Sequence, residues 1–262
     1  MNILDSIVEH KRVEVMKRKM KRPISNLRTM PFYGRQTNVI TLSKLEDRPG
    51  IIAEFKRKSP SKGPINVDVD PVVVANQYLS AGAAAVSVLT DRDFFGGSFQ
   101  DLQRVRDSNS DGVLLRKDFI IDPYQLHEAS AYGADMILLI ASILDRNEVA
   151  ELALEAKSLG LNVLFEVHGA DELEKYHPAI GYVGVNNRNL KTFGVDTNLS
   201  KNLIGQMPEG VLPVSESGLS GPEEIKRLYQ AGYRLFLMGE AFMKEADPGK
   251  ACAELIEQLK VV

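Results

Sequence analysis

The sequence predicts a (β/α)8 TIM barrel of the α/β class with a helical N-terminal extension. Three observations favour this fold: eight short apolar runs, a glycine at the head of each run, and a helical stretch between most successive runs. The spacing of the glycines, from 21 residues (Gly112 to Gly133) to 32 residues (Gly50 to Gly82), fits one βα unit each. An open doubly wound sheet is the alternative, but no G-x-G-x-x-G follows the first run.

The N-terminal segment is expected to be helical because apolar residues recur at roughly helical spacing beside the basic residues of 10–23. Pro23 should end this helix, and its cations should form a solvated face. The alternative is that these cations form a patch that binds nucleic acid or a membrane surface. We expect residues 1–48 to pack on the barrel, which makes 1–262 a single domain. Part of the extension should approach the first strand's site, because Pro49 leads directly into that strand.

The eight apolar runs have the character of strands covered on both faces, because they are short and almost continuously apolar. Helical patterns separate them, for example over 122–133, 145–160 and 221–232. A glycine that follows a helix is favoured there because it accepts the left-handed backbone conformation. The runs begin at Gly50, Gly82, Gly112, Gly133, Gly160, Gly181, Gly210 and Gly232.

Composition restricts the class of protein. The 262 residues carry a formal net charge of −3, which argues against general affinity for nucleic acid or anionic membranes. No apolar stretch approaches the roughly 18 residues of a membrane span. The single cysteine, Cys252, cannot form an internal disulfide. We expect a soluble, cytoplasmic protein that acts on a small molecule as a monomer or weak homodimer.

Polar residues end several of the predicted strands, where barrels of this class build their sites. A period of two places Glu54 and Lys56 on the same face, which points into the barrel. One reading is a set of salt bridges that closes the barrel mouth. So many charges from different strands favour a catalytic site instead. The residues are Glu54, Lys56, Lys117, Glu166, Asn186, Arg188 and Glu216.

The loops after the seventh and eighth strands predict a phosphate site, because barrels commonly bind phosphate there through backbone N–H groups. Lys56 or a neighbour could add positive charge. The residues expected at this site are Lys56, Ser59, Ser217, Gly218, Gly239 and Glu240.

Metal chemistry is poorly supported. The four histidines have no zinc-ligand spacing, and no cofactor motif is present, so we expect neither a metal nor a cofactor. His168 is the one histidine of interest, because it lies two residues after Glu166, but alternation could simply place it at the rim.

The strand ends resemble those of one known family. The segments "AEFKRKSPSKG", "LLRKDFIIDPYQ", "LFEVH", "VGVNNRNLKTF", "VSESGL" and "LMGEAF" occur in this order, and together they resemble indole-3-glycerol phosphate synthase of tryptophan biosynthesis. The resemblance runs along the whole chain. It implies ring closure of 1-(2-carboxyphenylamino)-1-deoxyribulose 5-phosphate to indole-3-glycerol phosphate, with loss of carbon dioxide and water.

The resemblance also implies roles. Lys117 is expected to be the general acid and Glu166 the general base. Lys56 would lie near the substrate carboxylate or act as a second acid, while Glu54 and Asn186 would orient the reacting groups. Arg188, Glu216 and Ser217 are expected to contact the substrate, and Phe95, Phe119 and Pro60 to form apolar walls. We expect the mixed-charge cleft to draw the acid and base pKa values toward working pH.

Two rival functions differ in chemistry. In a Schiff-base enzyme Lys117 would attack a carbonyl as its free amine, and borohydride would trap the adduct. In a sensor or scaffold the barrel would bind a phosphorylated metabolite without converting it, but a pure binder has little need of two lysines facing three glutamates.

Overall fold

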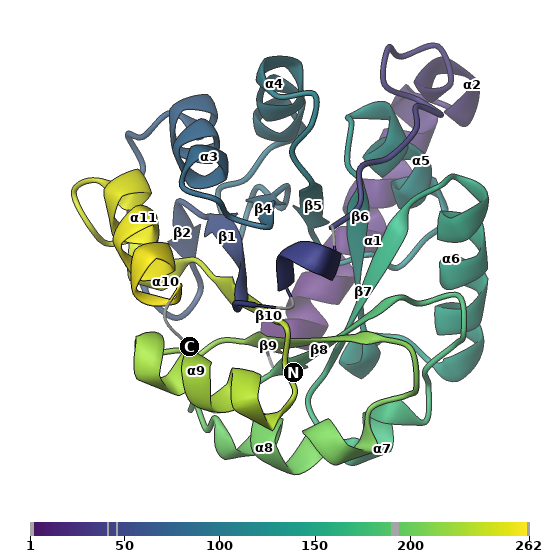
Figure 1. Ribbon diagram of the computed structural model, residues 1–262. Helices are drawn as coiled ribbons and strands as arrows, with labels where there is room; N and C mark the ends of the chain where they lie inside the picture. The colour runs from purple at the N-terminus through teal and green to yellow at the C-terminus, as the bar shows by residue number, and fades with distance from the viewer. Residues whose placement is uncertain (1–2, 41, 46, 190–193, 261–262) are drawn as a thin grey trace.

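The computed structural model describes residues 3–40, 42–45, 47–189 and 194–260, and its centre is a closed barrel of eight parallel strands (Figure 1). Each strand pairs with the next along the chain, and the first pairs with the last. The predicted TIM barrel is therefore confirmed, with one strand in every predicted apolar run. The strands are β1 (Gly50–Phe55), β4 (Ala85–Leu89), β5 (Leu114–Lys117), β6 (Met136–Ile140), β7 (Asn162–Val167), β8 (Tyr182–Asn186), β9 (Leu212–Glu216) and β10 (Leu235–Met238).

Helices surround the barrel, and several begin at a residue whose side chain caps the free backbone N–H groups. Asp70, Ser98 and Asp145 serve in this way, and Asp145 forms a capping box with Glu148. No helix within the described residues has the length and apolar character that a membrane span requires. The helices are α3 (Pro71–Ser80), α4 (Phe99–Ser108), α5 (Tyr124–Ala131), α6 (Arg146–Ser158), α7 (Ala170–Leu173), α8 (Asn198–Leu203), α9 (Pro222–Ala231), α10 (Glu240–Met243) and α11 (Pro248–Gln258).

Short elements complete the fold. The strands β2 (Lys58–Ser59) and β3 (Gly63–Pro64) form a small antiparallel sheet in the loop that follows β1. Short segments of 3-10 helix also lie in connections between the larger elements, namely η1 (Leu42–Leu45), η2 (Ala141–Ile143) and η3 (Ile204–Gln206).

The glycines at the heads of the runs have more than one role. Those with positive φ are Gly82, Gly133, Gly160, Gly210 and Gly232. The interpretation as left-handed turn residues is wrong for Gly50, Gly112 and Gly181, which do not have positive φ. Gly50 is the first residue of β1, where a Cβ atom would overlap the side chain of Leu45.

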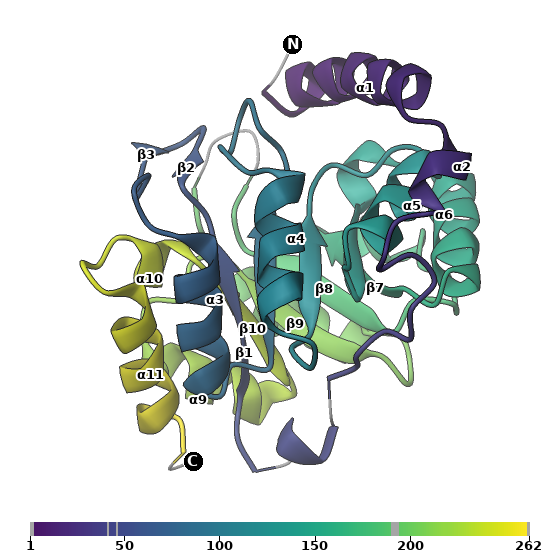
Figure 2. The same ribbon diagram turned by 90° about the horizontal axis from the view of Figure 1, so that it is seen from above.

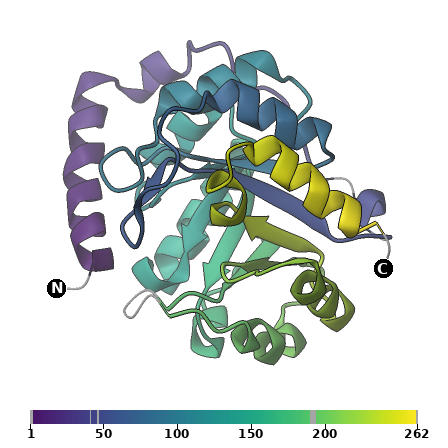
Figure 3. The same cartoon turned by 90° about the vertical axis from the view of Figure 1, so that its left-hand side faces the viewer.

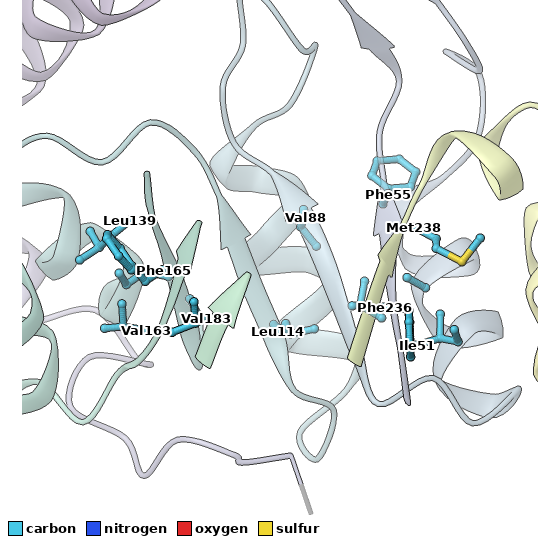
Figure 4. Packing of buried hydrophobic residues seen from close by; sticks show 14 of the residues in the cluster. Ile51, Phe55, Val88, Leu114, Leu139, Val163, Phe165, Val183, Phe236 and Met238 are labelled. Atoms are coloured by element: carbon cyan, nitrogen blue, oxygen red, sulfur yellow. The ribbon is translucent and has the colours of Figure 1, made fainter. Parts of the chain in front are cut away.

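Side chains alternate between two apolar layers along each strand. Ile51 and Phe55 of β1 point outward, into the layer between the strands and the helices that Figure 4 shows. Ile52 points inward and joins Leu138 and Leu164 in a second layer that fills the barrel. The next inward residue of β1 is Glu54, so the polar mouth lies directly above an apolar floor.

The N-terminal extension runs from one end of the barrel to the other. The helix α1 (Ile3–Lys21) lies at the mouth, the short α2 (Ile24–Leu27) packs beside α5, and η1 lies at the opposite end (Figures 2 and 3). Between them Thr37 donates a hydrogen bond to the carbonyl of Gly160, which precedes β7. Part of the extension approaches the site, as expected, because Ile3, Leu4 and Ile7 line the cavity at the mouth. The reason given from the sequence was wrong, since η1, just before Pro49, lies at the opposite end. The part of the extension near the mouth is α1.

Lys11 corrects the prediction that the cations of α1 form a solvated face. Its side chain is 0% exposed, and Nζ lies 2.8 Å from Asp91 Oδ2 and 2.9 Å from Asp118 Oδ1. Although burial opposes the charge, these carboxylates raise the pKa of Lys11 above its ordinary value. Met16 and Met20, by contrast, are 55% and 81% exposed. The helix therefore docks through an ion cluster and a narrow apolar contact.

Asp91 and Asp118 follow β4 and β5, so the Lys11 ion pairs fasten α1 to the rim of the barrel. Replacing Lys11 with Met leaves Asp91 buried without this cation, a change that typically costs about 3 kcal/mol or more. We expect Lys11→Met to lower the free energy of unfolding by about that amount in urea denaturation. Lys17→Met alters an exposed lysine of the same helix and should change it by less than about 0.5 kcal/mol. Equal stabilities of the two variants would contradict this role.

Candidate active site

The polar strand ends meet in one cavity of about 510 Å³ at the carboxyl end of the barrel. The structure brings together every residue that the sequence predicts for the site, although lining a cavity does not assign a role. These residues are Glu54, Lys56, Ser59, Pro60, Phe95, Lys117, Phe119, Glu166, Asn186, Arg188, Glu216, Ser217, Gly218, Gly239 and Glu240.

The individual residues of the floor and the roof of the cavity were not predicted, although part of the extension was expected to approach the site. Leu138 and Leu237 form part of the floor from inside the barrel, and strand alternation could have identified them. Ile3, Leu4 and Ile7 of α1 contribute to the roof. No local pattern indicates the roof, because the docking of α1 depends on partners far away in the sequence.

Two lysines and three glutamates form the charged centre of the cavity. Lys56 Nζ lies 2.6 Å from Glu54 Oε1, which confirms that these two side chains share a face. Lys117 Nζ lies 3.6 Å from Glu166 Oε2 and 3.9 Å from Glu216 Oε2. Because the glutamates are almost completely buried, each lysine stabilises a negative charge that water reaches poorly.

The pKa values of Lys117 and Glu166 contradict the expectation that both are drawn toward neutrality. Burial disfavours the ammonium, but Glu166, Glu216 and Glu54 raise the pKa of Lys117 above its ordinary value. Burial likewise disfavours the carboxylate, but Lys117 and His168 lower the pKa of Glu166 below its ordinary value. Mutual attraction therefore outweighs desolvation, and both groups stay charged around neutral pH.

Glu216 differs from the other two glutamates because it favours the protonated form. Burial and the neighbouring charge of Glu166 raise its pKa well above the ordinary value. The close approach of the Glu216 carboxyl group in turn contributes to lowering the pKa of Glu166. The neighbouring carboxyl groups therefore differ in their pKa values, so that Glu166 favours the ionised form and Glu216 the protonated form.

Gly184 of β8 makes this contact between carboxyl groups sterically feasible. It pairs with Glu166 in the register of β7 and β8, so it lies on the strand between Glu166 and the strand of Glu216. A Cβ atom at Gly184 would overlap Glu216 Oε1 and lie 3.2 Å from Leu164 Cδ1. A glycine inside a strand signals close approach of another group, and this signal was missed in the sequence.

The neighbouring asparagines have separate functions. The Asn186 side chain is hydrogen-bonded to Glu166, and its Oδ1 accepts a hydrogen bond from the backbone of Arg188 at 3.0 Å. Asn187, which the sequence analysis did not select, donates from Nδ2 to the carbonyls of Glu216 and Ser217 at 3.1 and 3.2 Å. Asn187 thereby fixes the loop after β9 to the end of β8.

The predicted phosphate loops border one side of the cavity. Ser217 and Gly218 both have positive φ, at 65° and 70°, where the chain turns sharply after β9. Gly239 follows the last residue of β10 and faces inward, since a Cβ there would lie 2.8 Å from Glu54 Oε1. The Glu240 carboxylate lies 3.5 Å from Lys62 and 3.7 Å from Arg188, so its negative charge is paired with cations.

An aromatic wall borders the side of the cavity near β4 and β5. The rings of Phe95 and Phe119 lie 5.9 Å apart, inclined at 40°. The neighbouring cations of the rim are paired, because Arg57 binds Asp101 at 2.5 Å and Lys58 donates to the carbonyl of Asp93 at 2.7 Å. Within the described ranges, no cluster of His, Cys, Asp or Glu side chains is arranged to hold a metal ion.

Comparison with known proteins gives one consistent family. A family model described as Indole-3-glycerol phosphate synthase matches residues 4–255. The indole-3-glycerol phosphate synthase of Bacteroides thetaiotaomicron is 44% identical over 259 residues, which cover 99% of each chain. That of Salinibacter ruber is 44% identical over 257 residues, which cover 97% of this chain and 95% of its own.

Solved structures support the fold alone. The crystal structure of 3-hexulose-6-phosphate synthase superposes with a TM-score of 0.63 at 16% identity and covers 80% of this chain and 99% of its own. The crystal structure of KGPDC from Streptococcus mutans gives a TM-score of 0.60 at 15% identity, with coverage of 81% of this chain and 98% of its own.

Gly184→Ala should displace the Glu216 carboxyl group and separate it from Glu166. Because a displacement of about 1 Å in a site can cost on the order of 10²-fold, we expect a drop in turnover of the family's substrate of that order. Gly181→Ala is the matched control, since nothing lies within 4 Å of a Cβ at this position, just before the same strand. Steady-state kinetics on the two variants checks the prediction, and equal turnover would contradict it.

Proposed function

The chain belongs to the indole-3-glycerol phosphate synthase family, and from that membership we propose how its cavity closes the indole ring. The substrate is 1-(2-carboxyphenylamino)-1-deoxyribulose 5-phosphate, and the products are indole-3-glycerol phosphate, carbon dioxide and water. The observation that carries the proposal is the position of the Lys117 ammonium, which lies within 4 Å of Glu166 and Glu216 in a single cavity.

The reaction requires both proton donation and proton removal. When the benzene carbon attacks the ribulose carbonyl, the carbonyl oxygen takes up a proton, and loss of the carboxylate as carbon dioxide restores the aromatic ring. The resulting hydroxyl group then takes up a second proton and leaves as water. A base finally removes one proton from the new ring and completes the indole. One proton per turnover therefore comes from solvent.

Lys117 is suited to the donating steps. Its ammonium stays charged because the neighbouring glutamates, Glu166 foremost, raise its pKa above the ordinary value, so a proton is present at Nζ throughout the physiological pH range. Donation to the carbonyl oxygen also removes charge that would otherwise develop on that oxygen in an apolar site. The raised pKa argues against the Schiff-base alternative, in which Lys117 must first lose its proton to act as a nucleophile.

Glu166 is suited to the removing step. Lys117 and His168 keep it ionised, so it can accept a proton, and the Asn186 side chain fixes its orientation. Glu216 holds its own proton nearby and can return one to the site after Glu166 has been protonated. The base, Glu166, and the protonated group that can return a proton to the site, Glu216, thus lie side by side.

Lys56 and Glu54 form the second charged pair of the proposal. Lys56 is bound to Glu54 at 2.6 Å and is 17% exposed, which leaves its ammonium accessible to a substrate carboxylate. Binding that carboxylate beside the apolar rings of Phe95 and Phe119 would leave it poorly solvated, which favours its loss as carbon dioxide.

The two ends of the substrate differ in chemistry, and so do the two sides of the cavity. We assign the benzene ring to the wall of Pro60, Phe95 and Phe119, and the phosphate to the loops that follow β9 and β10. Lys62 and Arg188 support the phosphate assignment, because they place positive charge beside those loops. Substrate contacts are further assigned to Ser59, Ser217, Gly218, Gly239 and Glu240.

The N-terminal extension belongs to the same functional unit in this proposal. Ile3, Leu4 and Ile7 line the cavity beside residues of the barrel, which supports residues 1–262 as a single domain with 1–48 as its extension. We also propose that the enzyme acts as a monomer or weak homodimer. A cytoplasmic location fits an enzyme whose substrate is a phosphorylated intermediate.

Lys117→Met tests the proposal most simply, because methionine keeps the length of the lysine stem and packs well. The variant should fold normally, with turnover lowered about 10²-fold or more and the Michaelis constant changed little. Appearance of indole fluorescence is a sensitive assay, since the protein contains no tryptophan.

Lys58→Met is the matched control, because Lys58 contacts the carbonyl of Asp93 at the rim and does not line the cavity. It should retain most of the wild-type turnover. A folded Lys117→Met protein with near-normal turnover would move the acid to Lys56. Trapping of wild-type Lys117 by borohydride in the presence of substrate would support the Schiff-base mechanism instead.

A further inference from the structure

We propose that His168, backed by Glu172, is a positioning residue that holds the catalytic base Glu166 ionised and oriented from outside the cavity. The inference rests on the proposed function, because it assumes that Glu166 is the base. His168 follows the last residue of β7 and does not line the cavity, so it has no direct access to substrate there.

The Glu166 carboxylate lies between a cation inside the cavity and an imidazole outside it. Its Oε2 atom faces Lys117 Nζ at 3.6 Å, and its Oε1 atom lies 3.6 Å from His168 Nε2. The His168 side chain is only 14% exposed, so water screens this second contact poorly. Each oxygen of the base is thus opposite a different positively charged or protonatable group.

A second carboxylate fixes the other side of the imidazole. His168 Nδ1 lies 3.1 Å from Ser142 Oγ and 3.5 Å from Glu172 Oε2. Ser142 donates to Glu172 Oε1 at 2.7 Å, while the backbone N–H of His168 donates to Glu172 Oε2 at 2.6 Å. These contacts join η2, the end of β7 and α7, so the ring orientation is determined by three elements.

The charges around His168 favour the imidazolium. Burial opposes its charge, and Lys117 repels it, but Glu172 and Glu166 together raise the pKa of His168 above its ordinary value. An imidazolium placed between two carboxylates attracts both of them. Its effect on Glu166 is to lower the pKa of that carboxyl group.

This arrangement determines which carboxyl group of the Glu166 and Glu216 pair is the base. Lys117 attracts both groups at similar distances, 3.6 and 3.9 Å, and so discriminates weakly between them. His168 lies against Glu166, whereas the Oε1 atom of Glu216 lies against Gly184. The additional positive charge beside Glu166 favours ionisation of Glu166 over ionisation of Glu216, so Glu166 is the group that can accept a proton.

The test is the pH dependence of turnover in His168→Gln. Glutamine keeps hydrogen-bonding capacity but removes the positive charge, so the pKa of Glu166 should rise. Because the base must be ionised, the acidic limb of the turnover profile should move to higher pH by about one unit, the usual scale for loss of a neighbouring charge. The Michaelis constant should change less than about twofold, since His168 does not line the cavity.

Two further variants make the result decisive. Glu172→Gln removes the outer support of the imidazolium and should move the limb in the same direction by a smaller amount; it also provides the test if His168→Gln does not fold. His177→Gln, at a partly exposed histidine elsewhere, should leave the profile unchanged.

An active His168→Gln protein whose acidic limb coincides with that of the wild type would overturn the inference and leave His168 a rim residue. Failure of the wild-type protein to convert the substrate at any pH would instead overturn the proposed function. The two failures are therefore distinguishable.

Discussion

The pairing of buried charges is the constraint on which this structure depends. An ion that leaves water without a partner costs several kcal/mol, so a site with several buried charges is stable only when positive and negative groups alternate. Lys117 satisfies this condition for Glu166, Lys56 satisfies it for Glu54, and Glu216 avoids the cost because it favours the protonated form. The barrel provides the geometry, because inward positions of different strands converge at its carboxyl end. The side chains whose charges stabilise one another are therefore the same side chains to which we assign the reaction.

The same constraint explains how the N-terminal helix reaches the mouth. Lys11 is buried between carboxylates that follow β4 and β5, and the neighbouring residues of α1 complete the apolar side of the cavity. Asp118 contacts both Lys11 and Arg116, so the ion cluster under α1 continues into the strand that carries Lys117. The roof of the cavity and its catalytic centre are thus connected through a chain of charged contacts.

Local patterns in the sequence were sufficient for the barrel and for the charged strand ends at its mouth, whereas the wall of Pro60, Phe95 and Phe119 came from the family resemblance. Alternation placed Glu54 and Lys56 inward because that periodicity belongs to the strand itself. The burial of Lys11 was not predictable, since a lysine within a run of cations looks solvated until distant aspartates are placed beside it. Gly184 and the pKa of Glu216 were missed for the same reason, because both depend on which side chains face each other across β8.

The charge state of Lys117 is the central claim, and NMR of lysine side chains labelled with ¹⁵N and ¹³C tests it most directly. The Lys117→Met protein assigns the resonance by its loss. Because carboxylates surround Lys117, its signal should remain that of an ammonium up to about pH 10.4, the ordinary lysine pKa, and beyond. A titration of this resonance between about pH 7 and 9 would mean that Lys117 is available as a free amine, and would contradict its role as a permanently protonated acid.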